Sequence, residues 1–379
     1  MSGAIKRAAR SQRWTHRKER RLAVSGRLPT RALAGAAVAM LAAGITACGS
    51  ASGGGSSSSG SSALPTVTMM VGGIDKQIYL PYQLAQDLGY YKKYGVNMQL
   101  STEQTGGVGA ETAMASGQVD MAGAWYVHTI DFQLAGKNVV DVAQLSGAPG
   151  ERVMCANGSG VKSPADWKGK SIGVTDIGSG TDDLVLYLAA RYHLTSKQFS
   201  RVAVGAGPTV IAALQHHRVA CAMTTQPTVN AIEKQHMGYS AIDLATTAGV
   251  NQWLGGFQPT AGVLAQASWV SSHKDIVQKV VDALAATMHW ISTHSAAQIA
   301  AKMPPAYVSN GLTTRADYIS ALAKDKAQFL PNGMMPATGP QTVLAVEKMA
   351  GKVTHPVNLT TTYTNSFVIS ANKLEGFNK

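Results

Sequence analysis

The sequence is poor in cysteine and in aromatic side chains, and it lacks the short motifs of common catalytic sites. It has three cysteines in 379 residues, and aromatic residues make up 6%. No GxSxG, HExxH or CxxC motif occurs, so nothing indicates a serine hydrolase, a zinc peptidase or a dithiol redox enzyme. No Gly-Lys-Ser/Thr follows the GSGT segment at 178–181, so this segment is not a Walker A nucleotide loop. We therefore expect no catalytic residues, no cofactor and no bound metal.

Positive charge is abundant but unevenly distributed. The formal net charge of the chain is +12. Residues 1–31 contain ten Lys or Arg and one acid, for +9, which leaves 23 basic and 20 acidic residues, or +3, in the rest of the chain. Because the basic excess is confined to the start of the chain, the high pI does not indicate a nucleic-acid partner.

The N-terminal region has the layout of a secretion signal. Basic residues precede an apolar run at 32–48, ALAGAAVAMLAAGITAC, in which small residues come directly before Cys48. Ile45-Thr46-Ala47-Cys48 resembles a bacterial lipobox, which predicts that residues 1–47 are a signal peptide and that Cys48 is acylated. The alternatives are an ordinary signal peptide, or a membrane span, with a chance cysteine. Sixteen apolar or small residues are marginal against the roughly 20 that a span needs.

A tether follows the cysteine. Residues 48–63 are almost entirely Gly, Ser and Ala after Cys48, and such a chain is a flexible coil with a reach of about 20 Å. We therefore expect an extracytoplasmic protein, held at the cell membrane by a lipid on Cys48.

The remaining chain alternates strands and helices. We expect a strand at 66–71, a helix at 79–94, and a similar alternation that restarts at Lys170 and includes a helix at 182–193. This order predicts an α/β fold with mainly parallel, doubly wound sheets and helices on both faces. Residues 64–379 exceed the length at which single cores stop growing, so two lobes are expected. Toward the C-terminus, helical patterns occupy 273–302, 313–329 and 340–350.

Cys155 and Cys221 both lie in strand-like runs, ERVMCA and VACAMT. In an oxidising compartment the pair is a candidate disulfide. Two separately buried thiols are an equal alternative.

Four segments resemble solute-binding proteins of nitrate/sulfonate/taurine-type ABC importers, and the chain is also similar to binding proteins for thiamine-precursor pyrimidines. The segments are YLPYQLAQDLGYYKKYGVNMQL (79–100), AMASGQVDMA (113–122), VKSPADWKGKSIGV (161–174) and VACAMTTQP (219–227). Trp167 departs from the usual Leu of its motif.

The resemblance implies a bilobal fold like that of periplasmic binding proteins, with two doubly wound lobes joined by a two-segment hinge. It places lobe one at 64–149 plus 260–379 and lobe two at 150–259. The hinge segments would lie near 147–153 and 257–261.

In such sheets a solute binds beyond the carboxyl ends of the strands. The GSGT segment, with Gly178, Ser179, Gly180 and Thr181, stands between a predicted strand and a predicted helix. Its amides and the helix dipole favour an anion, and its hydroxyls can donate hydrogen bonds. Plain helix capping is the alternative. Two acids that follow, Asp182 and Asp183, would repel an anion.

Further ligand contacts are expected from the other loops at this edge. In lobe one these are Gly73, Ile74, Lys76, Gln77, Thr105, Gly106, Trp125, Tyr126 and His128, and in lobe two Gln226. Lys76 suits an anionic solute, or it is a solvated surface lysine. Trp125 and Tyr126 either cover the ligand or pack inside lobe one.

The resemblance implies the substrate-binding component of an ABC importer. We expect a monomer that captures a small, anionic organic solute by hinge closure and delivers it to a permease driven by an ATPase. Two other functions are open: binding of a neutral aromatic heterocycle, such as a thiamine-precursor pyrimidine or a flavin, and solute sensing by a lipoprotein. A fungal relative of this fold makes such a pyrimidine with a cysteine-rich motif, which this chain lacks, so an enzyme is not expected.

Overall fold

The computed structural model describes residues 63–103 and 108–377. The predicted signal peptide, Cys48, nearly all of the tether, and Thr105 and Gly106 lie outside these residues. Within the described ranges, no helix combines the length and the apolar character that crossing a membrane requires. Residues 63–377 carry a hydrophobic core of their own, so by this criterion they can fold without the preceding segment.

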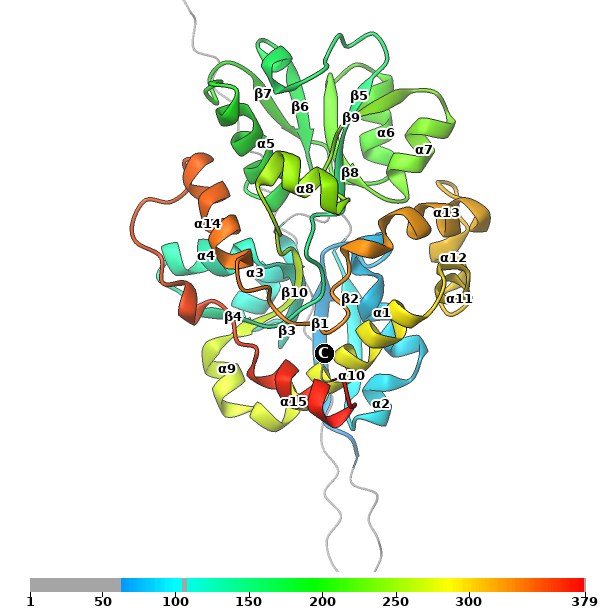
Figure 1. The fold of residues 1–379 in the computed structure, drawn as a ribbon, viewed down its shortest axis with the longest axis vertical. Helices are drawn as coiled ribbons and strands as arrows, with labels where there is room; N and C mark the ends of the chain where they lie inside the picture. Colours follow the sequence, from blue (N-terminus) through cyan, green and yellow to red (C-terminus); the bar gives the residue numbers. More distant parts are fainter. Residues whose placement is uncertain (1–62, 104–107, 378–379) are drawn as a thin grey trace, which may run out of the picture. The chain divides into compact units, whose positions relative to one another are not determined.

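The first lobe is built on a five-stranded mixed sheet in the order β2-β1-β3-β10-β4 (Figure 1). β1 pairs in parallel with β2 and β3, whereas β10 runs antiparallel to both β3 and β4. The bounds are β1 (Thr66–Val71), β2 (Asn97–Thr102), β3 (Met121–Trp125), β4 (Val139–Gln144) and β10 (Ala261–Gln266).

The second lobe is built on a separate five-stranded sheet in the order β7-β6-β8-β5-β9. β6 is parallel to β7 and β8, and β5 is antiparallel to β8 and β9. The bounds are β5 (Glu151–Ala156), β6 (Ser171–Val174), β7 (Ser200–Ala203), β8 (Cys221–Thr225) and β9 (Gly238–Asp243).

The expected bilobal α/β fold is confirmed, and the chain passes between the two sheets twice, from β4 to β5 and from β9 to β10. Each sheet contains one antiparallel strand that the simple βαβ pattern did not predict. These strands, β5 and β10, are the first that the chain forms after each passage. The predicted lobe limits at 149/150 and 259/260 stay predictions.

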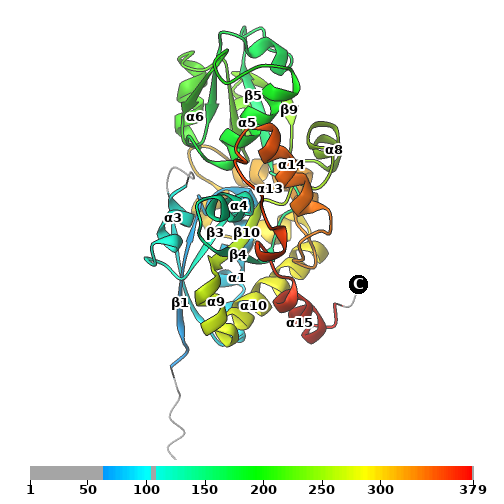
Figure 2. The same cartoon turned by 90° about the vertical axis from the view of Figure 1, so that its left-hand side faces the viewer.

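Helices cover the sheets (Figures 1 and 2). Up to the second passage they are η1 (Gln77–Tyr79), α1 (Leu80–Asp87), α2 (Tyr90–Lys93), α3 (Gly109–Ala115), α4 (Val127–Leu134), η2 (Pro164–Trp167), α5 (Gly180–Arg191), α6 (Pro208–Gln215), α7 (Thr228–Lys234) and α8 (Thr247–Leu254). After it they are α9 (Ala267–Ser272), α10 (Lys274–Thr293), α11 (Ala296–Ala300), α12 (Pro305–Val308), α13 (Arg315–Asp325), η3 (Lys326–Gln328), α14 (Gly339–Met349), η4 (Leu359–Thr361) and α15 (Ser366–Leu374).

Two predicted helices are interrupted. The helix expected at 79–94 divides into α1 and α2 because Gly89 adopts a left-handed conformation with φ of +72°. The helix expected at 273–302 stops at Thr293, and Ser295 starts α11 with a capping box that also uses Gln298.

Cys155 and Cys221 lie directly opposite each other in the antiparallel pair of β5 and β8. The structure joins them by a disulfide that spans 66 residues of sequence. The bond therefore ties the first strand of the second lobe to a central strand of the same sheet.

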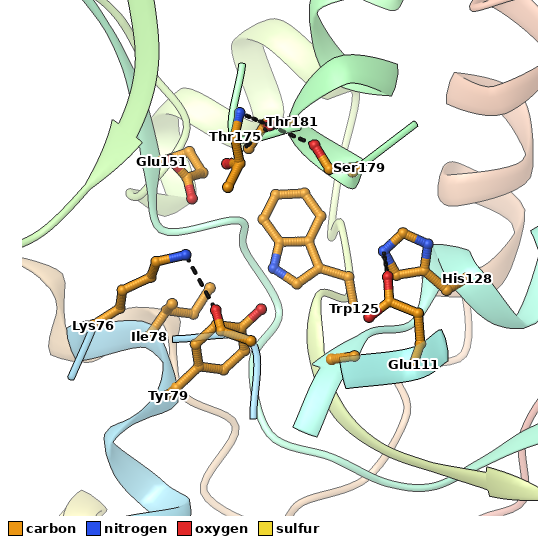
Figure 3. Close-up of a pocket in the computed structure, with 13 residues that line it drawn as sticks. Lys76, Ile78, Tyr79, Glu111, Trp125, His128, Glu151, Thr175, Ser179 and Thr181 are labelled. Carbon is orange, nitrogen blue, oxygen red and sulfur yellow. Dashed lines mark hydrogen bonds and ion pairs between the residues drawn. The ribbon is translucent and has the colours of Figure 1, made fainter. Parts of the chain in front are cut away.

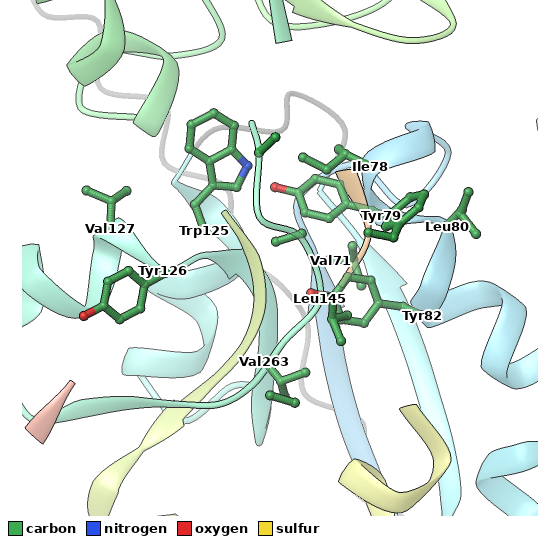
Figure 4. Close-up of a cluster of buried hydrophobic side chains, with 14 of the residues drawn as sticks. Val71, Ile78, Tyr79, Leu80, Tyr82, Trp125, Tyr126, Val127, Leu145 and Val263 are labelled. Carbon is green, nitrogen blue, oxygen red and sulfur yellow. The ribbon is translucent and has the colours of Figure 1, made fainter. Parts of the chain in front are cut away.

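The main hydrophobic core extends through both lobes. Figure 4 shows the part that lies near the strands of the first lobe, with Val71, Tyr82, Leu145 and Val263 among its members. Tyr82 is fully buried and donates a hydrogen bond from its hydroxyl to the Gly262 carbonyl at 2.6 Å. This core holds the end of β3, and with it Trp125, in place.

Candidate ligand-binding site

A pocket lies where residues of the two lobes meet (Figure 3). Because β5 runs antiparallel to β8, its first residue, Glu151, stands opposite Thr225 at the carboxyl end of β8. The start of β5 and the loops after the other strands therefore share one edge, as expected for a site in an open α/β sheet. The first lobe contributes Gly72, Lys76, Ile78, Tyr79, Glu111, Ala124, Trp125 and His128, and the second contributes Glu151, Thr175, Ser179, Gly180 and Thr181.

The Trp125 indole lies in the middle of the pocket (Figure 3). The side chain comes from the end of β3 and is only 7% exposed. A Cβ atom placed on Gly180 would lie 2.1 Å from Cε3 of the indole, so the ring packs directly on the backbone at the start of α5. The remaining cavity is about 20 Å³, enough for about one water molecule. A larger solute therefore requires Trp125 or the lobes to move.

The GSGT segment forms the start of α5, with Ser179 as the N-cap residue. The Ser179 hydroxyl donates to the Asp176 carbonyl at 2.7 Å and lies 2.8 Å from the Thr181 hydroxyl. Thr181 Oγ1 also accepts from the Thr175 amide at 2.9 Å. Both hydroxyls thus hold the loop in shape and also line the pocket, although the Ser179 side chain makes no capping hydrogen bond to the amides of α5.

The amides of the first helical turn remain available. Within the described residues, no hydrogen bond is present from the backbone N–H of Gly180 or Thr181, as is usual for the first residues of a helix. Both residues line the pocket, so α5 offers it two donors and the positive end of a helix dipole.

Lys76 lies at the edge of the pocket and is half-buried. Its ammonium donates to the Gly72 carbonyl at 3.1 Å and lies 5.9 Å from the centre of the Tyr79 ring. Burial lowers the pKa of Lys76, and the charges of Glu151, Asp75 and Glu103 oppose that change. Lys76 is therefore not the solvated surface lysine of the alternative interpretation.

Glu151 faces the same pocket from the second lobe. It is 5% exposed, and its Oε2 has no hydrogen-bond partner within residues 63–103 and 108–377. Burial raises its pKa to about 7, although the positive charges of Lys76 and Arg152 counteract part of the effect. Glu151 consequently exchanges its proton near neutral pH. Sequence reasoning missed it, although a carboxylate within the predicted hinge segment near 147–153 was a usable signal.

His128 and Glu111 form an ion pair on the other side of Trp125. His128 Nε2 lies 3.1 Å from Glu111 Oε1, and His128 Nδ1 lies 3.1 Å from Asp131 Oδ2. Burial by itself lowers the pKa of His128, but the charge of Glu111 and the hydrogen bond to Asp131 outweigh it and raise the pKa to about 9. His128 is therefore positively charged at neutral pH and neutralises Glu111.

Tyr126 does not line the pocket. It is fully buried, its hydroxyl pairs with Thr362 Oγ1 at 2.6 Å, and its ring meets the edge of Tyr363. Its backbone caps α4, which begins at Val127, so the segment expected to be a loop is the start of a helix. Figure 4 shows Trp125 and Tyr126 pointing to different sides of the strand. Of the two aromatic residues considered as ligand contacts, Trp125 lines the pocket and Tyr126 does not.

Gln77 and Gln226 link the lobes instead of lining the pocket. The backbone N–H of Gln77 donates a hydrogen bond to the backbone carbonyl of Gln226 at 3.2 Å. The side-chain Nε2 of Gln77 donates to the backbone carbonyl of Tyr318 at 2.9 Å. Gln226 Oε1 accepts from the Asn230 amide at 3.1 Å. Both side chains are nearly fully buried.

The other predicted residues lie beside the pocket. Gly73 has a left-handed φ of +99°, and a Cβ there would lie 2.7 Å from Lys76 Cε. Ile74 lines a neighbouring cavity with Lys76. The Gly178 amide donates to Asp182 Oδ2 at 2.9 Å. Thr105 and Gly106 lie outside the described residues.

The arrangement suits binding of a small polar molecule. It combines the Lys76 ammonium, two helix amides and the Trp125 ring with a carboxylate, Glu151, that readily takes up a proton. Ser179 donates to a backbone carbonyl, and His128 contacts carboxylates, so these two residues do not form a nucleophile–base pair.

Comparison with known proteins identifies both sequence and structural relatives. The family model described as "NMT1/THI5 like" matches residues 78–297, more than half of the chain. The 4-amino-5-hydroxymethyl-2-methylpyrimidine phosphate synthase THI12 of Saccharomyces cerevisiae is 32% identical over 108 residues, which are 28% of this chain and 32% of the relative. The chain therefore spans about a third of the length of the curated relatives it matches.

Two solved structures share the fold over most of the chain. One from Bordetella bronchiseptica RB50 has a TM-score of 0.75 and 27% identity, and it covers 82% of this chain and 98% of its own. The alkanesulfonate-binding protein SsuA of Xanthomonas axonopodis pv. citri, bound to MOPS, has a TM-score of 0.63 and 16% identity, with coverage of 79% and 98%. The resemblance expected from the sequence is thereby confirmed.

The contact between Trp125 and Gly180 is testable by a double-mutant cycle in residues 63–379. Gly→Ala in a helix ordinarily stabilises by up to about 1 kcal/mol, but G180A should cost about 1–3 kcal/mol because the new methyl group overlaps the indole. In a W125A background the cost should disappear. Urea unfolding measures both values.

G311A serves as the matched control, since no atom lies within 4 Å of a Cβ at Gly311. An equal cost of G180A with and without Trp125 would show that the ring does not pack on the start of α5.

Proposed function

The chain belongs to the NMT1/THI5-like family, and on this basis we propose that it is the substrate-binding component of an ABC importer. It captures a small, anionic organic solute, of the sulfonate, nitrate, taurine or carboxylate class, and delivers it to a permease. The observation that carries this proposal is the pocket that residues of both lobes line. A solute held by both lobes stabilises their approach, and this is the signal that a permease can recognise.

The charges around the pocket support an anionic solute. Lys76 and the start of α5 both favour negative charge. Asp182 and Asp183, which would repel an anion, are neutralised, since Asp182 pairs with Arg201 and Asp183 Oδ1 lies 2.8 Å from Lys352 Nζ. Glu111 is neutralised by His128. Of the two acids among the described residues that line the pocket, Glu151 is therefore the one that opposes an anion, when it is ionised.

A neutral aromatic heterocycle is the second candidate, and Trp125 is the observation that favours it. An indole beside a carboxyl group that can donate or accept a proton suits a ring such as an aminopyrimidine. The family includes pyrimidine phosphate synthases. We infer a binding protein and not such an enzyme, because Cys155 and Cys221 are joined in a disulfide and form no cysteine-rich catalytic motif.

The location that follows is the outer side of the cell membrane. The basic lead, the apolar run and Ile45-Thr46-Ala47-Cys48 support export and lipid attachment at Cys48. The mature protein acts as a monomer beside the membrane, without nucleic acid, and its partners are the permease and ATPase.

Lipid attachment predicts a specific change of mass and of location. Intact-mass spectrometry of the membrane fraction should find a chain that begins at Cys48 and carries a diacylglyceryl group. The C48S variant should be absent from the membrane fraction, because Cys48 alone carries the lipid anchor. Recovery of an unmodified or uncleaved wild-type chain would contradict the assignment.

A ligand screen tests the function directly. Thermal unfolding of residues 63–379 against sulfonates, nitrate, carboxylates and aminopyrimidines should give a stabilisation of about 2.7 kcal/mol at 100 times the dissociation constant. For an anionic hit, K76M should weaken binding at least about tenfold, or about 1.4 kcal/mol, because it removes the ammonium of the pocket.

K92M, at an exposed lysine of α2, is the control and should bind the hit like wild type. Tight anion binding by K76M would refute the role of Lys76, whereas a hit confined to aminopyrimidines would favour the second candidate. If the protein converts any solute into a product, it is an enzyme and the proposal of a binding protein is wrong.

Binding of an anionic hit should depend on pH through Glu151. Below its pKa of about 7 the carboxyl group is neutral, and above it the carboxylate repels the anion. If only the neutral form permits binding, the apparent dissociation constant rises about tenfold from pH 6 to pH 8. His128, with a pKa of about 9, stays charged over this range.

E151Q should bind with an affinity that is the same at pH 6 and pH 8. Isothermal titration at both pH values measures the effect. A persistent tenfold change in E151Q would assign the pH dependence to another group.

A further inference from the structure

A cluster of carboxylates lies next to the pocket but does not line it. Asp131 on α4, Asp183 on α5 and Glu347 on α14 each place one carboxylate oxygen within 4.8 Å of the other two. Figures 1 and 2 both show α14 beside α5 and α4. Asp183 comes from the second lobe and the other two residues from the first, so the cluster connects the lobes.

Two of the three carboxylates are deeply buried. Asp183 and Glu347 are each 1% exposed, and Glu347 Oε2 has no hydrogen-bond partner among the residues that the structure describes. A buried carboxylate without a partner costs several kcal/mol if it is ionised. The side chain of Asp131 is 27% exposed, so the cluster has access to solvent on that side.

The neighbouring charges do not balance the cluster. Lys352 Nζ lies 2.8 Å from Asp183 Oδ1, and His128 lies between Asp131 and Glu111 at 3.1 Å from each. Four carboxylates and two cations leave two negative charges when all groups are ionised.

We propose that Asp131, Asp183 and Glu347 bind one calcium ion between the two lobes. Carboxylate oxygens are the ligands that hard divalent cations prefer. Calcium binds oxygens at about 2.3–2.6 Å, so three oxygens that lie within 4.8 Å of one another can all contact one ion. Magnesium demands near-ideal octahedral geometry and gives up its water reluctantly, whereas calcium accepts irregular sets of carboxylates. The double charge of the ion also reduces the excess negative charge of the cluster.

Lys352 is the competitor for this site. Its ammonium already contacts Asp183, and its side chain is 29% exposed, so it can turn toward solvent when calcium binds. A site with ligands from both lobes stabilises the arrangement in which the lobes meet. Calcium binding is therefore a property of the lobes themselves and does not depend on the identity of the solute.

The test uses residues 63–379, freed of metal with a chelator and studied without solute. Titration calorimetry with calcium chloride should show one site, and calcium should raise the unfolding temperature more than magnesium does. E347Q keeps the shape of the side chain, relieves a buried charge, and should weaken calcium binding at least tenfold. D131N, at the partly exposed ligand, should also weaken it.

K352M should have the opposite effect and strengthen calcium binding, because it removes the competing ammonium. D275N, at an exposed acid in the first turn of α10, is the matched control and should bind calcium like wild type. Absence of any calcium-dependent heat and shift in wild type would overturn the proposal. If E347Q and D131N both bind calcium with wild-type affinity, the ion binds elsewhere. The same conclusion follows if K352M binds calcium with wild-type affinity. None of these outcomes bears on the solute pocket, which the ligand screen tests separately.

Discussion

The packing of the Trp125 indole on the backbone of Gly180 is the contact on which the interlobe site depends. An aromatic ring from the last residue of β3 lies against the first residue of α5, and only a residue without a Cβ permits that approach. Thr175, Ser179 and Thr181 hold the α5 start in shape by hydrogen bonds among themselves. The pocket is therefore a gap between two rigid surfaces, and its size follows from how closely they meet.

Ion pairs and hydrogen bonds between the lobes surround this contact. Arg152 of β5 pairs with Asp325 of α13 at 2.8 Å, and Lys234 of α7 pairs with Asp317 of the same helix at 2.8 Å. The first pair is buried and the second largely exposed, so the first contributes more to the specificity of the approach. On the opposite side, Asp183 and Lys352 make the corresponding link. Residues after β10 thus contact the second lobe on both sides of the pocket.

Much of the fold could be predicted from the sequence, because local patterns determine local structure. The strand at 66–71 and the GSGT start of α5 are explained by a short apolar run and by a glycine-rich turn before a helical pattern. The antiparallel direction of β5 and β10 could not be predicted, because it depends on where the chain crosses between lobes. Trp125 and Lys76 were expected in the pocket for their chemistry. Of the two alternatives for Tyr126, the structure shows the one in which its ring packs inside lobe one. Neighbouring residues at a strand end point to different sides, and the sequence does not specify which side faces the ligand.

By itself, the sequence determined the α/β class, the two-lobed organisation, the signal and lipobox pattern, and the family resemblance, since each rests on residues that are close together in the chain. The tertiary structure alone decided the partners of the charged groups. Glu151 meets Lys76 across the pocket, and Asp131, Asp183 and Glu347 converge from three helices that lie far apart in the sequence. The spacing of residues in the sequence cannot reveal such a cluster. The burial of its carboxylates and the distances between them are set only when the two lobes pack together, and these decide its electrostatics.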